Sequence, residues 1–170
     1  GMWDQTITIS SAGKTFSATG WKVGWAYGAA DLIKPIMMAN QWIQYSVATP
    51  NCRAIAEVLE KSEDPYEGAP NYFEHLRGEY ARKRDHLGQT LRDAGLNPVM
   101  PEGGFFIVAD AAKYMPDEKY FLAPGPDGSS PVTKDWAFAR WLTNEHGVTN
   151  IPMSTFYTPE LKHSVGNLGE

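Results

Sequence analysis

Hydrophobic and polar residues alternate along the start of the chain in the manner of a strand. Residues 6–10 alternate with a period of two and are rich in β-branched side chains, which favours an extended backbone. Residues 21–28 have a similar composition, with glycines that indicate close approach of two backbones. The pattern beyond them predicts helices over residues 29–45 and 50–61. Thr49, which is followed by a proline, is the expected N-cap of the second helix.

The longest predicted helix covers residues 71–94 and ends at Gly95, a residue type that commonly follows a helix. Its apolar side chains recur at helical spacing and form one stripe. The stripe consists of Phe73, Leu76, Tyr80, Leu87, Leu91 and Ala94. The basic run at residues 82–84 lies mainly off this stripe, and we interpret it as a solvated face of the helix.

The second half of the chain alternates short apolar segments with stretches rich in glycine and proline. Thr133 is the expected N-cap of a further helix, and Gly147 is the residue expected to end it. The predicted elements are strands over 98–100 and 104–109, a long surface loop over 110–131, a helix over 134–146 and a strand over 148–151. We expect a domain boundary around residues 70–95.

Composition and charge narrow the class of protein. The 170 residues are 42% hydrophobic and carry a formal net charge of −5, which argues against disorder and against a nucleic-acid-binding surface. The apolar runs are far shorter than the ~20 residues of a membrane span, and the first residues lack the pattern of a signal peptide. The single cysteine, Cys52, fits a reducing compartment, and the histidines are too scattered for a metal site. We expect a cytoplasmic α/β protein, with mitochondria as the alternative, that binds no nucleic acid, membrane or metal.

The residues around Lys14 carry the most informative chemistry. The Gly-Lys-Thr sequence at residues 13–15 is similar to the end of a phosphate loop, but that motif requires a glycine at position 8, which is threonine. A lysine amine where a strand runs into a turn can be desolvated into a nucleophile for a Schiff base. Ser11 and Lys22 lie near enough in sequence to hold a phosphate beside it, and the small residues at 12 and 13 would let a flat ligand approach the backbone. The alternative is two surface lysines that flank a β-turn.

Three segments of the chain, in order, resemble one family of enzymes. The first, residues 11–25, has the sequence SAGKTFSATGWKVGW. It resembles the Schiff-base lysine region of class I/II (fold type I) pyridoxal-phosphate aminotransferases, most of all the kynurenine/glutamine aminotransferase and cysteine-conjugate β-lyase subgroup. Residues 101–110, PEGGFFIVAD, resemble a strand of the family's small domain. Residues 148–157, VTNIPMSTFY, resemble its Ile-Pro-x-Ser-x-Phe-Tyr segment.

The resemblance implies an α/β fold in two domains. Residues 1–75 would be the C-terminal part of the large cofactor-binding domain, which has a mixed, mostly parallel sheet with helices. Residues 76–170 would be most of the small α/β domain. The intact protein would be a homodimer.

The resemblance also assigns roles to individual residues. Lys14 would form the internal aldimine with pyridoxal 5'-phosphate and act as general base and acid in the proton shift. Ser11 and Lys22 would bind the cofactor phosphate, and Lys22 lacks the bidentate fork of the arginine that is common in relatives. Tyr45 matches an aromatic position that reaches into the partner subunit's pocket. The next residue is Ser46, where relatives often carry histidine, so the substrate preference stays open.

The implied reaction moves an amino group from an amino acid to a 2-oxo acid. The donor would be kynurenine, glutamine, or an aromatic or sulfur amino acid, with cysteine-conjugate β-lyase chemistry as a side activity. The family also requires an aspartate at the pyridine nitrogen and an arginine for the substrate carboxylate, and we expect both to lie outside these 170 residues. The first hypothesis is that the chain is an internal part of an active aminotransferase and is inactive by itself. The second is that these residues are the whole product, a catalytically inactive fragment or interaction module. The third is a phosphate-loop nucleotide binder.

Overall fold

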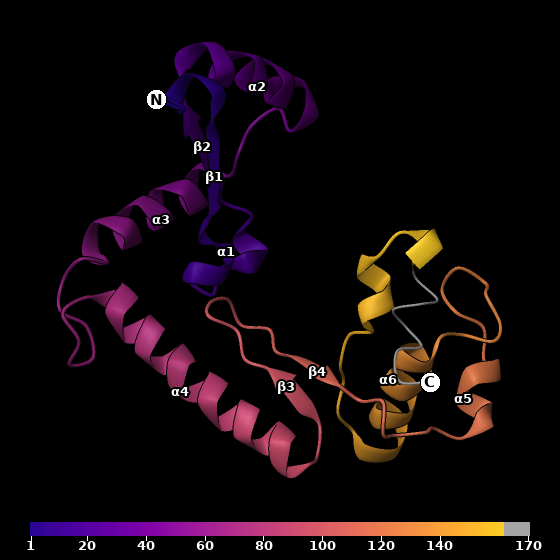
Figure 1. The fold of residues 1–170 in the computed structure, drawn as a ribbon. Helices are drawn as coiled ribbons and strands as arrows, with labels where there is room; N and C mark the ends of the chain where they lie inside the picture. The colour runs from indigo at the N-terminus through magenta and orange to yellow at the C-terminus, as the bar shows by residue number, and fades with distance from the viewer. Residues whose placement is uncertain (162–170) are drawn as a thin grey trace. The chain divides into compact units, whose positions relative to one another are not determined.

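The computed structural model describes residues 1–161 of the chain. It divides into two compact units, Gly1–Glu79 and Tyr80–Glu170, and both contain helices and short strands (Figure 1). The longest helix, α4, spans Tyr72–Asp93 and contributes residues to each unit. The assignment of residues 1–75 to a large domain and of 76–170 to a small domain stays a prediction.

The first unit is built on an antiparallel hairpin. Its elements are η1 (Trp3–Gln5), β1 (Ile7–Ser11), α1 (Ala12–Thr15), η2 (Thr19–Trp21), β2 (Gly24–Gly28), α2 (Ala30–Ile43) and α3 (Thr49–Lys61), where η marks a 3₁₀ turn. The register pairs Ile7 with Gly28 at one end of the hairpin and Ser11 with Gly24 at the other. Because α1 follows Ser11 and α2 begins two residues after Gly28, the two helices start from opposite ends of the hairpin (Figure 1).

A small hydrophobic cluster fixes the α1 end of the hairpin. Ala12, Ala18 and Ile55 are buried in this cluster. The half-buried side chains around them are Phe16, Val23, Trp25 and Leu59. Since Ile55 comes from the middle of α3, the cluster packs α3 against the turn that carries α1. This packing compensates for the shortness of α1, because a single helical turn is marginally stable by itself.

One feature of this unit differs from expectation. Helix α3 begins at Thr49, and its N-cap is Ala48, which makes no side-chain hydrogen bond to the helix. Strands β1 and β2 form an antiparallel pair; the mixed, mostly parallel sheet was predicted for the family's whole large domain, of which residues 1–75 would be a part. The pair is antiparallel because the chain turns back after β1 through α1 and η2, and a parallel pair would need a crossover to the other end of the sheet.

The second unit combines the end of α4 with a short strand pair and further helices. Its other elements are β3 (Asn97–Val99), β4 (Val108–Asp110), α5 (Glu118–Leu122), α6 (Lys134–His146) and η3 (Met153–Phe156). Strands β3 and β4 pair antiparallel, with Asn97 opposite Asp110. Left-handed glycines follow α4 and α6 as predicted, with φ of 74° at Gly95 and 68° at Gly147.

The segment 110–131, expected as a surface loop, contains the helix α5. Tyr120 of this helix is buried with Val132 and Ala137 in the core of the second unit. The guanidinium of Arg140 on α6 donates hydrogen bonds to the carbonyl oxygens of Tyr120, at 3.3 Å, and Pro124, at 2.6 Å, and also to that of Ala123. The burial of one tyrosine and the capping of these carbonyls by Arg140 thus stabilise a helix that composition alone does not indicate.

Two further sequence expectations differ in the second unit. Residues 148–151 are not a strand, because the N–H of Val148 donates to Leu142 O and its carbonyl accepts from the Thr143 hydroxyl. These bonds fold the segment back onto the end of α6. On α4, Tyr80 and Leu87 of the predicted apolar stripe are exposed, whereas Gly88 is buried against Met100.

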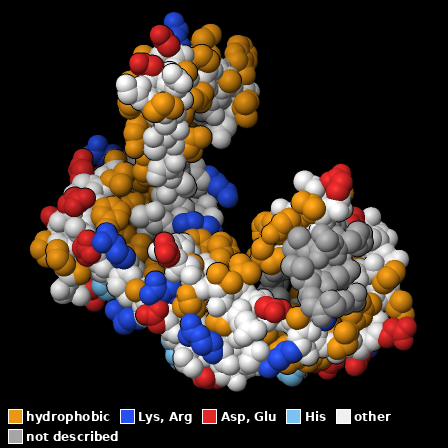
Figure 2. All heavy atoms as spheres, in the orientation of Figure 1, with side chains coloured by type: hydrophobic (Ala, Val, Ile, Leu, Met, Phe, Trp, Pro, Cys, Tyr) orange, Lys and Arg blue, Asp and Glu red, His pale blue; other side chains and the backbone are white. Residues whose placement is uncertain are grey.

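The apolar side chains of α2 are largely exposed. None of its residues is buried, and the exposed side chains include Met37, Met38, Trp42 and Ile43. Figure 2 shows hydrophobic side chains gathered over this helix. Within residues 1–161, no helix has both the length and the apolar character needed to cross a membrane.

Candidate active site

Lys14 lies on the short helix α1, directly behind strand β1. Ser11 ends the strand and caps the helix, because its Oγ accepts a hydrogen bond from the Gly13 N–H at 3.1 Å. The same hydroxyl donates to the carbonyl of Val23 at 3.3 Å, and Val23 O also accepts the Ala12 N–H at 3.1 Å. The strand therefore ends at Ser11, whose side chain caps the following helical turn, and this turn carries the exposed side chain of Lys14.

Lys22 stands at the same end of the hairpin. It precedes Val23, whose carbonyl is bonded to both Ser11 and Ala12, so the hairpin brings together three of the four predicted site residues. Its backbone is left-handed, with φ of 57° and ψ of 40°, a conformation that strains a residue with a β-carbon. The side chain of Asn51 on α3 holds the preceding carbonyl, Trp21 O, at 3.2 Å.

The small residues before Lys14 serve packing. Ala12 is fully buried, and a β-carbon on Gly13 would meet both Ser11 Oγ and the Cα of Thr19 at 3.3 Å. Protein atoms therefore fill the space that was expected to admit a flat ligand. A ligand can approach this end of the hairpin from the side of the exposed Ser11, Lys14 and Lys22 side chains instead.

Tyr45 is not brought to this end of the hairpin by the described contacts. It follows α2, has a left-handed φ of 64° and is 89% exposed. Its predicted role in a partner subunit's pocket stays a prediction. The exposure of its ring and of the preceding helix leaves it accessible to another molecule.

Two hydroxyl groups that sequence reasoning missed hold the turn on either side of Lys14. Thr19 Oγ1 donates to Gly13 O at 3.0 Å, and Tyr72 Oη donates to Thr15 O at 2.6 Å. Thr19 belongs to residues 11–25, the motif that carries the family resemblance, so the sequence could have indicated it as a residue of the site. Tyr72 lies 57 residues from its acceptor, and no local pattern indicates the contact.

In the second unit, the segment 148–157 is fixed by a buried polar network. Ser154 is only 1% exposed, and Asp135 accepts its N–H at 2.8 Å and its hydroxyl at 3.1 Å. Asp135 also accepts the Thr133 hydroxyl at 2.5 Å. The network ties η3 to the start of α6. Ser154 therefore has a structural function, and Asp135 is a residue that sequence reasoning did not find.

Charged groups also join α5 to α6. Glu145 accepts hydrogen bonds from Lys119, at 3.0 Å, and from the Tyr120 hydroxyl. The Tyr120 bond, followed by the Lys119 bond, lowers the pKa of the Glu145 carboxyl below its usual 4.5. The hydrogen bond of Lys119 with Glu145, followed by its hydrogen bond with Tyr120, raises the pKa of the Lys119 ammonium above its usual 10.5. The cluster stabilises the packing of the two helices and lies in a different unit from Lys14.

A cavity of about 460 Å³ lies in the second unit among β3, β4, α6 and residues 150–153. Asn150 Oδ1 is buried and accepts no hydrogen bond from the described residues. Lys134, also on the cavity wall, donates to Ala112 O at 2.9 Å. None of the four predicted site residues lines this cavity, since all of them belong to the first unit.

Comparison with known proteins defines the class of protein to which this hairpin site belongs. Residues 2–167 match the family described as aminotransferase class I and II, and the chain therefore belongs to this family. It is 43% identical to a kynurenine–oxoglutarate transaminase of Dictyostelium discoideum over 92% of its own length. It is 39% identical to kynurenine–oxoglutarate transaminase 3 of Homo sapiens over 95% of its length. The predicted family is confirmed.

Solved structures give the same result for the fold. Bna3p of Saccharomyces cerevisiae, described as a candidate kynurenine aminotransferase, matches 98% of the chain with a TM-score of 0.82 and 32% identity. N-succinyldiaminopimelate aminotransferase of Mycobacterium tuberculosis matches 96% with a TM-score of 0.67 and 30% identity. The predicted fold class is confirmed. The chain spans about a third of each relative, 35% and 34% of the two transaminases and 37% of each structure.

Proposed function

We propose that this chain supplies the cofactor lysine of a pyridoxal-phosphate-dependent aminotransferase. The substrates would be an amino acid (kynurenine, glutamine, or an aromatic or sulfur amino acid) and a 2-oxo acid, with cysteine-conjugate β-lyase chemistry as a side activity. The observation that carries the proposal is the placement of Lys14 on a fixed turn beside Ser11 and Lys22, in a chain that belongs to this family. The printed names of the transaminases support the choice of kynurenine.

The groups at the end of the hairpin fit such a cofactor in their chemistry. An aldehyde requires an amine, and Lys14 supplies one on an exposed side chain. A phosphate dianion requires hydrogen-bond donors, which Lys22 and Ser11 supply. Ser11 would rotate its hydroxyl away from Val23 O to donate to a phosphate oxygen. The bond from Ser11 to Val23 O is long, at 3.3 Å, and therefore weak, so breaking it costs little.

The residues of the chain then have separate tasks. Pyridoxal phosphate, when bound, supplies the electron sink that stabilises negative charge at the substrate Cα. Lys14 Nζ takes the proton from this Cα and returns it during the transfer. Lys22 and Ser11 anchor the phosphate, so that the reacting carbon is held close to Lys14.

An absorbance titration with pyridoxal phosphate tests the proposal. The chain should develop a visible band that the free cofactor lacks, and Lys14→Ala should abolish it. Lys34→Ala is the matched control, since Lys34 is an exposed lysine on α2, away from the α1 end of the hairpin. A well-folded chain without the band, or a band that Lys14→Ala leaves unchanged, would refute the assignment. Because the chain is expected to be inactive alone, a transamination assay with kynurenine and a 2-oxo acid, made on the intact protein, separates the aminotransferase from the inactive module.

We further propose that the protein is a homodimer and that Tyr45 enters the partner subunit's pocket. The exposed apolar face of α2 supports this, because contiguous apolar surface of this kind usually marks an interface. Trp42, which is 86% exposed, is the side chain to test. Light scattering should give a dimer mass for the chain and a monomer mass for Trp42→Glu. A wild-type chain that stays monomeric at high concentration would contradict the proposal.

A further inference from the structure

The two carbonyl groups on either side of Lys14 are held by hydroxyl groups from outside its helix. Thr19, in η2, donates to Gly13 O at 3.0 Å. Tyr72, the first residue of α4, donates to Thr15 O at 2.6 Å. Both bonds are partly shielded from water. The backbone at Lys14 is therefore fixed on both sides by side-chain hydroxyl groups.

A helix as short as α1 needs such support. The last carbonyls of any helix have no intrahelical partner, and α1 contains only the four residues Ala12–Thr15. Its own bond from the Phe16 N–H to Ala12 O, at 3.0 Å, closes a single turn. Without the two hydroxyl groups the turn would be free to fray, and the Lys14 side chain would move with it.

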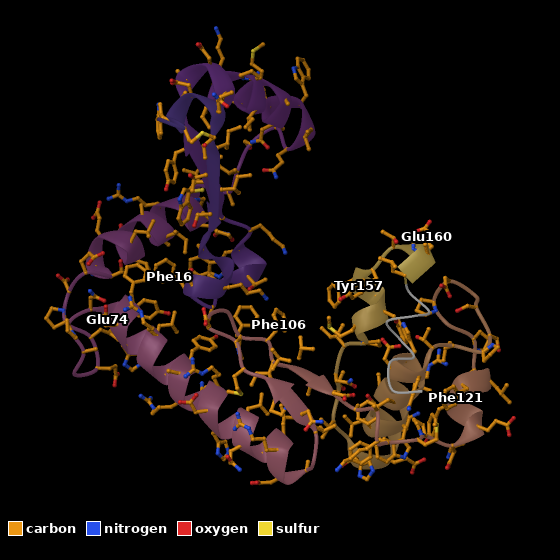
Figure 3. The ribbon with its side chains drawn as sticks, viewed as in Figure 1. Phe16, Glu74, Phe106, Phe121, Tyr157 and Glu160 are labelled. Carbon is orange, nitrogen blue, oxygen red and sulfur yellow. The ribbon has the colours of Figure 1, made fainter. Side chains whose placement is uncertain are left out.

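The Tyr72 phenol is itself held in place by packing. Its ring stacks on Phe16, with centroids 5.3 Å apart and an interplanar angle of 27°. The ring of Tyr66 meets it edge-on at 5.4 Å. In Figure 3 the side chain of Phe16 lies close to the start of α4, which is marked by Glu74. The hydroxyl therefore reaches Thr15 O from a rigid aromatic group.

We propose that Thr19 and Tyr72 are positioning residues for the Lys14 amine. The inference rests on the proposed function of Lys14, and it adds two residues that determine where the amine stands. Precise placement matters because a shift of about 1 Å in a reacting group can slow a reaction by about a hundredfold. The hydroxyl groups act through the backbone of α1 and touch no reacting atom.

The test compares hydroxyl deletions with matched controls in the full chain. Tyr72→Phe removes the hydroxyl and keeps the stacked ring, whereas Tyr66→Phe makes the same change in the same aromatic cluster but away from α1. Thr19→Val removes the second hydroxyl, and Thr19→Ser should restore it. Thermal unfolding of every variant identifies any general loss of stability.

Two measurements are made on each variant. The first is amide hydrogen exchange over residues 12–16 without added ligand, which reports the order of the turn independently of any cofactor. The second is the rate at which pyridoxal phosphate modifies Lys14. The amine adds to the aldehyde carbon, the carbonyl oxygen leaves as water, and borohydride reduces the C=N bond to a stable secondary amine that mass spectrometry locates.

We expect exchange to rise about fivefold in Tyr72→Phe and in Thr19→Val, the change in equilibrium that corresponds to the loss of one net hydrogen bond. Labelling of Lys14 should fall by at least the same factor. Tyr66→Phe and Thr19→Ser should match the wild type in both measurements. Unchanged exchange in both deletions would overturn the inference, and so would faster exchange with an unchanged labelling rate. Hydrogen exchange by itself does not test the proposed function of Lys14. A wild-type chain that is not labelled at Lys14 would refute that function.

Discussion

Removal of the Asp135 carboxylate should weaken the second unit by an amount that its contacts define. Asp135 accepts hydrogen bonds from the N–H groups of Ser154 and Trp136 and from the hydroxyls of Ser154 and Thr133. Ser154 is 1% exposed and Thr133 is 3% exposed, so the surrounding protein shields these groups from solvent. Their two hydroxyl oxygens are 3.3 Å apart, which allows one hydroxyl to donate to the other.

After Asp135→Ala, one buried N–H, one buried hydroxyl proton and the N–H of the half-buried Trp136 are therefore left without their acceptor. Each unsatisfied donor costs about 1–3 kcal/mol, so the expected loss in the free energy of unfolding is about 3 kcal/mol. Asp127→Ala is the matched control. Its carboxylate accepts the N–H and hydroxyl of Ser129 at 3.0 and 2.6 Å in an exposed turn, and its loss should cost less than about 1 kcal/mol.

Urea unfolding followed by tryptophan fluorescence and by circular dichroism measures both variants. Coincident transitions from the two probes would allow the free energies to be compared directly. If Asp135→Ala loses no more stability than Asp127→Ala, the buried network does not hold η3 to α6, and the structural function given to Ser154 is wrong.

Three further predictions concern pH and backbone geometry. Hydrogen bonds lower the pKa of Glu145 below 4.5 in the folded state, so its contribution to stability should be complete above about pH 4.5 and should be lost as the pH falls through the folded pKa. Urea titrations at a series of acidic pH values should therefore show a weaker decrease in stability for Glu145→Gln than for the wild type. An equal decrease in the two proteins would contradict this. Lys22→Gly should raise the free energy of unfolding by about 1 kcal/mol, because glycine relieves the strain of the left-handed backbone. Lys22→Ala should leave this free energy unchanged. A glycine variant that is less stable than the alanine variant would refute the prediction. A β-carbon at Gly28 would lie 2.8 Å from Thr6 O, so Gly28→Ala should lower the free energy of unfolding by about 1–3 kcal/mol and the unfolding midpoint with it. A β-carbon at Gly20 would meet no atom within 4 Å, so Gly20→Ala should leave the midpoint unchanged. Equal midpoints for the two variants would count against the hairpin geometry.

Sequence pattern predicted the elements whose signals are local. The period-two alternation before Ser11 corresponds to β1, and the glycines at 95 and 147 follow α4 and α6. The pattern failed where a distant partner decides the structure. Helix α5 forms because Tyr120 is buried against α6 and Arg140 binds the carbonyls that follow it. Residues 148–151 have strand-like composition, but their hydrogen bonds go to α6.

The candidate site shows the same division. Ser11, Lys14 and Lys22 belong to one continuous motif, and a hairpin register that sequence could not fix brings them to one end of the structure. The supporting hydroxyl of Tyr72 comes from another helix and could not be inferred from spacing. The left-handed backbone of Lys22 was also unforeseen, because lysine is not a residue that favours it.

The identity of the lysine that pyridoxal phosphate modifies tests the central claim most directly. The chain is incubated with the cofactor, reduced with borohydride and digested, and the modified peptide is located by mass spectrometry. The account predicts that modification concentrates on Lys14 and that Lys22→Ala weakens it by loss of the phosphate anchor. Modification spread over exposed lysines in proportion to their accessibility, with no preference for Lys14, would contradict it.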